Sequence, residues 1–297
     1  MLRGSHFWAC LTLPRAGTSI WRMQPPPIRQ PAVAGRFYPG KPETLTRDLD
    51  KYLAPEPGPA EKVENALGCV VPHAGYMYSG HVAGAVYRRL PARSSYVILC
   101  PNHTGRGAPL AIMSSGVWLT PLGKVPIDSD LAKAVQQGCH LVMEDAAAHA
   151  DEHSLEVQLP FLQRTVKEFS FVPIAIGVGG YAGLESLGRG IAQAARRVKK
   201  PFLIIASSDM NHYEPDSITR AKDRQAIDKM LAFDPQGLYE VLRREDISMC
   251  GYGPAIAMLT ATKELGAKHA ELAKYATSAD TGGDRSAVVG YAGIIVS

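Results

Sequence analysis

Four titratable side chains come directly after apolar runs of the sequence. The stretch ALGCVVPH ends at His73, VILCPNH ends at His103, and FLIIASSDMNH carries Asp209 and ends at His212. If these runs are strands of one α/β sheet, their carboxyl ends form a common crevice, which is where ligands bind in such sheets. A single histidine after a strand is more often part of a turn or of the core. Three such strand ends together predict a site.

A cysteine adds a different kind of donor. Cys250 lies in ISMCGYGPAIAML, in the irregular approach to a helix that begins near Pro254. Two imidazoles and one thiolate suit iron, copper or zinc far better than magnesium or calcium, and three protein ligands leave a position open for water, substrate or dioxygen. The residues therefore indicate a transition-metal site made of two of the strand-end imidazoles and Cys250. The alternative for Cys250 is a small buried hydrophobic residue.

His212 and Asp209 are also suited to proton transfer. Imidazole titrates near neutral pH, so His212 is suited to moving protons, and Asp209 is expected to orient His212 or a water molecule. The alternative for Asp209 is a helix N-cap or an Asx turn.

The segment AHADEHSLEVQLPF, residues 148–161, adds further polar groups, namely Asp151, Glu152, His153 and Glu156. Helical spacing places Glu152 and Glu156 on one side, where they could orient the ligating imidazoles. The pattern fits equally well an amphipathic helix with a charged face in solvent. It is not an HExxH zinc motif, because no second histidine follows at the required step.

The elements that must position these residues follow an α/β pattern, in which short β-branched apolar runs alternate with segments of helical period. The predicted strands are Ala66–Val71, Tyr96–Cys100, Phe171–Ile176, Phe202–Ala206, Glu271–Thr277 and Ala287–Val296. The predicted helices are Glu43–Leu53, His81–Leu90, Ser129–Gln137, Leu184–Val198, Ile218–Ala232, Pro235–Arg244 and Pro254–Leu265. GVGGYA at residues 177–182 also fits a nucleotide-binding turn, but no acidic residue follows about 20 positions on.

Length and composition indicate a globular protein in which one domain spans residues 28–297. The 297 residues are 46% hydrophobic, which is enough for a substantial core. Residues 1–27 have no periodicity and are predicted to be a disordered or artefactual leader. Three of the four net positive charges come from Arg3, Arg15 and Arg22, and the rest of the chain is nearly neutral, so the sequence predicts no nucleic-acid partner. The leader contains no apolar run long enough for a membrane span, so none is predicted. Five irregularly spaced cysteines indicate reduced thiols and a cytoplasmic location.

Five motifs in this order resemble the Memo family, which includes protein B of the AmmeMemoRadiSam system: PHAGYMYSG, CPNHTG, DEHSLEVQLPF, SSDMNHYE and CGYGP. The resemblance covers roughly residues 28–297, including QPAVAGRFYPG near its start and DRSAVVGYAG near its end. It implies a single α/β domain with a mixed or parallel sheet flanked by helices, similar to the class III extradiol dioxygenases, which use non-haem iron.

Carried over by motif, the resemblance implies that His73 and His103 are metal ligands, that Cys250 is the Memo-type cysteine, and that His212 beside Asp209 is the acid/base. The dioxygenases have a carboxylate where this chain has Cys250. A thiolate shifts the preference towards copper(I), zinc or a redox-tuned iron, so ring cleavage of a catechol does not follow. Iron or copper is the expected cofactor, and zinc is a further possibility.

Two functions of different class therefore remain. The first is a metal-dependent redox or oxygenase-like enzyme acting on an unknown small molecule. The second is a metal- or peptide-binding module without turnover, in line with the resemblance of the eukaryotic Memo branch to signalling adaptors. In prokaryotes the resemblance also implies a functional link to radical-SAM and AMMECR-type proteins.

Overall fold

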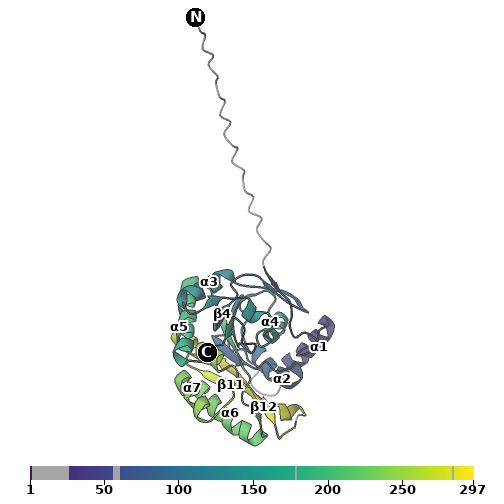
Figure 1. The fold of residues 1–297 in the computed structure, drawn as a ribbon. Helices are drawn as coiled ribbons and strands as arrows, with labels where there is room; N and C mark the ends of the chain where they lie inside the picture. The colour runs from purple at the N-terminus through teal and green to yellow at the C-terminus, as the bar shows by residue number, and fades with distance from the viewer. Residues whose placement is uncertain (2–26, 56–60, 178, 283) are drawn as a thin grey trace.

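The structure is a computed structural model that describes residue 1 and residues 27–55, 61–177, 179–282 and 284–297. The predicted leader therefore lies outside the described residues except at its two ends. The predicted α/β class is confirmed, because a mixed sheet is flanked by helices on both faces (Figure 1). No helix among the described residues is long and apolar enough to cross a membrane.

The centre of the main sheet consists of four parallel strands. In spatial order they are β2 (Gly68–Val71), β9 (Leu203–Ser207), β3 (Ser95–Pro101) and β8 (Ser170–Ile176). Every residue of these four strands is buried except the first residue of β8, as expected for parallel strands with both faces covered. Their carboxyl ends meet at one edge, which is where the candidate residues lie.

Antiparallel strands extend this sheet on both sides. Beyond β2 lies β12 (Val288–Val296), which pairs with β10 (His212–Glu214) and β11 (Ala270–Thr277). Beyond β8 lie β4 (Leu110–Ile112) and β7 (Met143–Glu144). A separate small sheet joins β1 (Ile28–Arg29), β5 (Val117–Thr120) and β6 (Gly123–Pro126).

Alternate side chains of the strands build two cores. Val70, Val97 and Ile204 face the helices α3 (Ser129–Gly138), α5 (Tyr181–Val198), α6 (Asp216–Leu231), α7 (Pro235–Arg244) and α8 (Tyr252–Glu264). Cys69 and Ile98 point to the opposite face, which is covered by α1 (Pro42–Leu53), α2 (Tyr76–Tyr87) and α4 (Leu159–Thr165). The two sets of helices lie on opposite sides of the sheet in Figure 1.

The six predicted strands and seven predicted helices are all present, with ends shifted by a few residues. The largest shift is in α2, which begins at Tyr76 rather than His81, so this helix starts three residues after His73. Short 3-10 turns at Ala147–His149, Glu156–Gln158 and Ser278–Thr281 were not predicted. The short strands β1, β4, β5, β6, β7 and β10 were not predicted either, because two to four residues are too few to show an alternating hydrophobic pattern.

Candidate metal centre

His73 is held at the end of β2 with its ring orientation fixed. Its backbone N–H donates to Asp209 Oδ1 at 2.7 Å, and its Nδ1 lies 3.0 Å from Ser207 Oγ. The Ser207 hydroxyl donates its own proton to the Ser154 carbonyl at 2.6 Å, so it can only accept from His73. The proton of the His73 ring therefore sits on Nδ1, and the lone pair of Nε2 is free for a metal.

Glu152 fixes His103 in the same way. The buried carboxylate accepts the backbone N–H of His103 at 2.6 Å and lies 3.0 Å from its Nδ1. Burial opposes ionisation of Glu152, but hydrogen bonds from His103 and Ser154 outweigh it and lower its pKa to about 2. Because Glu152 is ionised at neutral pH, Nδ1 of His103 donates to it, and Nε2 is the ring nitrogen left for a metal.

His153 lies beside His103 and shares its anchor. The two rings stack with centroids 4.8 Å apart, and Nδ1 of His153 lies 3.4 Å from the same Glu152 oxygen that His103 contacts. Phe37 also packs against the His153 ring, with centroids 4.6 Å apart. One carboxylate thus lies behind two imidazoles.

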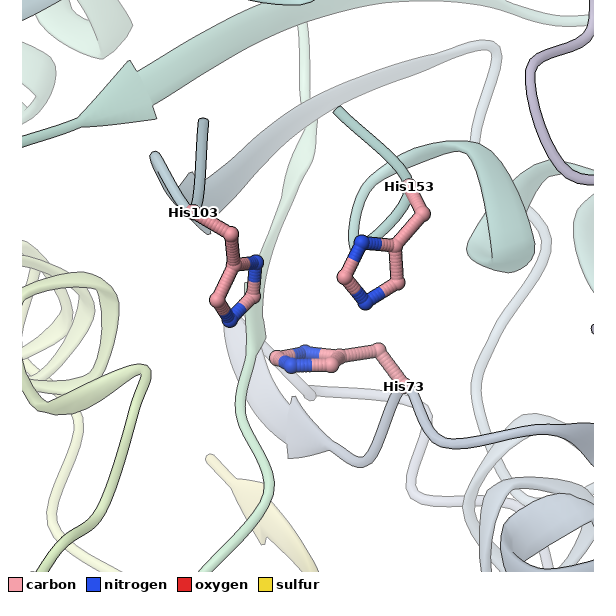
Figure 2. Close-up of side chains that lie close together, drawn as sticks. All are labelled: His73, His103 and His153. Atoms are coloured by element: carbon pink, nitrogen blue, oxygen red, sulfur yellow. The ribbon is translucent and has the colours of Figure 1, made fainter. Parts of the chain in front are cut away.

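The three imidazoles converge. Each offers a nitrogen, and the three nitrogens lie within 4.8 Å of one another (Figure 2). In Figure 2 one nitrogen of His103 and one of His153 point toward the ring of His73. Burial and the neighbouring imidazoles lower the pKa of His73 well below its usual value, so His73 is neutral at pH 7. Neutral imidazoles with free nitrogens are the form that binds iron, copper or zinc.

Cys250 extends this donor set. Its Sγ lies 3.2 Å from Nε2 of His73 and 3.7 Å from the carbonyl oxygen of Asp209. Burial and the nearby Asp209 raise the pKa of the Cys250 thiol, so without a metal the thiol carries its proton. The three converging imidazole nitrogens fit a transition metal. A metal that also used the sulfur would have to displace the thiol proton.

His212 and Asp209 lie beside the imidazoles in different settings. Nδ1 of His212 lies 2.9 Å from the Ser248 carbonyl oxygen and donates to it, which leaves Nε2 without that proton. Burial lowers the pKa of His212. Asp209 is 5% exposed, and burial raises its pKa to about 7 although the backbone N–H groups of His73 and Ala74 donate to it. Ser248 therefore orients His212, whereas the described hydrogen bonds of the Asp209 carboxylate are to the backbone of His73 and Ala74; that Asp209 orients a water molecule stays a prediction.

One cavity of about 790 Å³ is lined by the imidazoles, the thiol and Asp209. Its wall includes the five residues predicted from the sequence together with His153, and also Phe37, Tyr78, Tyr213, Tyr291 and Asp284. Tyr213 follows His212, is 77% exposed and has a φ of 60°, which is rare for a residue other than glycine. The cavity is open, aromatic at several points and contains no lysine or arginine among these described wall residues.

The structure brings His73, His103, Cys250, Asp209 and His212 to this one cavity. Sequence reasoning gave His153 only a supporting role, because the pattern of residues 148–161 was interpreted as a helix. In the structure a bend and a 3-10 turn precede α4, and Glu152 and Glu156 are fully buried. The alternative of a charged face in solvent is therefore wrong. The adjacent pair Glu152-His153 was the available signal for a donor on this segment.

Comparison with known proteins agrees with the motifs. The family model described as Memo-like protein matches residues 29–295. A MEMO1 family protein of Methanopyrus kandleri is 44% identical over 277 residues, which cover 90% of this chain and 98% of the relative. Those of Methanosarcina barkeri and Methanosarcina mazei are 45% and 46% identical over 270 residues, 91% of this chain and 100% and 99% of theirs. The chain belongs to the Memo family.

Proposed function

We propose that this chain binds one transition-metal ion, with iron or copper preferred over zinc, and that it acts as a redox or oxygenase-like enzyme on a small molecule. The observation that carries the proposal is the convergence of the nitrogens of His73, His103 and His153 within 4.8 Å. We further propose that the fold is related to that of the class III extradiol dioxygenases, in line with the parallel strand ends that carry the histidines.

His73, His103 and Cys250 are the proposed ligands, and His153 is a further nitrogen donor. Sulfur next to nitrogen donors favours copper or iron over magnesium and calcium. A redox-active metal held here would supply electron transfer that the side chains themselves cannot. The protein contributes fixed imidazole orientations, through Ser207 behind His73 and Glu152 behind His103.

His212 and Asp209 are the proposed proton-handling groups. Because the pKa of His212 is lowered, its Nε2 is unprotonated at neutral pH and can accept a proton from a bound molecule. Asp209, with a pKa of about 7, is partly protonated at neutral pH and can donate or accept. The two groups line the same cavity, so a ligand there can reach both.

The test is metal analysis after anaerobic purification, followed by an oxygen-uptake assay of the loaded protein against a panel of small molecules. We expect about one metal ion per chain and uptake that depends on the metal and on His212. A protein that binds no transition metal contradicts the proposal. Metal binding without any turnover removes the enzymatic part alone.

The second candidate is a peptide-binding module without turnover. The observation in its favour is that a hollow of about 400 Å³, lined by Tyr38, Tyr52 and the exposed Met77, adjoins the histidine cavity and shares Phe37, Gly75 and Tyr78 with it. Two neighbouring hollows that share aromatic wall residues could hold successive side chains of an extended peptide. Tight peptide binding that survives metal removal would favour this function over the enzyme.

A further inference from the structure

The segment that follows β1 packs against the loop that carries Glu152 and His153. Arg29 belongs to β1, and its side chain is buried although it is charged. A buried charge is costly unless it is paired and hydrogen-bonded, so its contacts indicate what it holds in place.

Arg29 joins the two ends of the loop. Its Nε donates to the His149 carbonyl at 2.8 Å, and its Nη2 donates to the Glu152 carbonyl at 2.8 Å. Its Nη1 lies 2.5 Å from Glu156 Oε2. The guanidinium also lies 4.1 Å from the centre of the Trp118 ring, which limits its movement. One planar group therefore holds two backbone carbonyls at and before Glu152 and the Glu156 side chain after His153.

Glu156 makes the reciprocal contacts to the segment after β1. Its carboxylate accepts the backbone N–H groups of Ala32 at 2.7 Å and Val33 at 3.1 Å, and the Tyr38 hydroxyl at 2.7 Å. Phe37 of the same segment packs on the His153 ring. The loop is thus held from behind by Arg29 and Glu156 and is covered in front by Phe37.

We propose that Arg29 is a positioning residue for the metal site: through the loop of residues 149–156 it sets where Glu152 and His153 lie, and through Glu152 it sets the orientation of His103. The inference rests on the proposed function, because it concerns the same metal. Arg29 touches no proposed donor side chain, so it acts only through the loop.

The experiment is an anaerobic titration of the full chain with Co²⁺, whose visible absorption reports the number and geometry of its ligands. The variants are Arg29→Lys, which keeps the charge but cannot reach three acceptors, and Glu156→Gln, which keeps the shape but loses the charge. The matched control is Arg89→Lys, because Arg89 is equally buried, binds Glu271 at 2.6 Å and lies in none of the contacts of the loop. Thermal melting of each variant measures any general loss of stability.

We expect Arg29→Lys and Glu156→Gln to weaken Co²⁺ binding about tenfold or more, as loss of an outer partner of a metal ligand does, and to change the absorption spectrum. Arg89→Lys should lower the melting temperature but change neither the Co²⁺ affinity nor the absorption spectrum. If Arg29→Lys does not fold, Glu156→Gln decides the outcome. Wild-type affinity and spectrum in the folded variants, or an equal change in Arg89→Lys, would overturn the inference. A wild-type chain that takes up no Co²⁺ overturns the proposed function as well.

Discussion

The candidate donors come from two structurally different regions. His73 and His103 follow β2 and β3, central strands whose neighbours on both sides are strands of the same sheet. His153 and Cys250 lie on irregular segments that depend on side-chain contacts for their position. The sheet places the backbone of the first pair, and Ser207 and Glu152 then orient the two rings, whereas the second pair lies outside any strand or helix. The two regions should therefore respond differently to substitution.

The largest expected effect is at the strand ends. His73→Ala or His103→Ala removes a proposed ligand whose backbone position is fixed by the sheet. We expect the metal affinity to fall by ~100-fold or more, since loss of an outer partner already costs 10–100-fold. Metal content measures the loss, and circular dichroism shows whether the variant is folded. A folded variant that keeps its metal would show that the substituted histidine is not a ligand.

Cys250 should give the site its pH dependence. The thiol is protonated without metal and His73 is not, so binding at Cys250 releases a proton. The affinity should rise about tenfold per pH unit between pH 6 and 8 and weaken as the pH falls. In Cys250→Ser this slope should disappear and the affinity should drop, whereas serine at Cys69, Cys100 or Cys139 should leave both unchanged. An unchanged slope in Cys250→Ser would exclude sulfur as a ligand.

A smaller effect is expected behind His212, where Asp223 is buried and hydrogen-bonds the Asn211 backbone at 2.9 Å and the Tyr275 hydroxyl at 2.7 Å. Burial raises the pKa of Asp223 to about 7. A raised pKa favours the protonated form in the folded state, so this contribution to stability is present below about pH 4 and is lost as the pH rises through 7.

Asp223→Asn should therefore remove part of the decline in unfolding free energy between pH 4 and pH 8, by roughly 1–2 kcal/mol. Urea unfolding at the two pH values measures it. The comparison of slopes cancels any change that does not depend on pH. A decline identical to that of the wild type would show that Asp223 does not titrate in this range.

The smallest effect concerns Tyr213, which has a left-handed backbone although it carries a side chain. Such strain costs roughly 1 kcal/mol, and asparagine tolerates this conformation better. Tyr213→Asn should raise the free energy of unfolding by about that amount while the metal affinity stays the same. A loss of stability would show that the tyrosine ring makes contacts that outweigh the strain.

The same contrast explains what the sequence could predict. His73 and His103 were found because an apolar run that ends in a polar residue identifies a strand end, and parallel strands bring such ends together. His153 was not recognised as a donor, because its position depends on Arg29 and Glu156, and Arg29 lies more than 100 residues away in the chain. No local pattern encodes contacts at that distance. Helical spacing in residues 148–161 was therefore misleading.

X-ray absorption at the metal edge of the anaerobically purified wild-type protein tests the central claim most directly. We expect about one iron or copper per chain, with imidazole scattering from at least two histidines and one sulfur near 2.3 Å, a typical metal–thiolate distance. The imidazole signal should fall in His103→Ala and the sulfur signal should vanish in Cys250→Ser. A protein that carries no transition metal, or a metal without imidazole ligands, would contradict it.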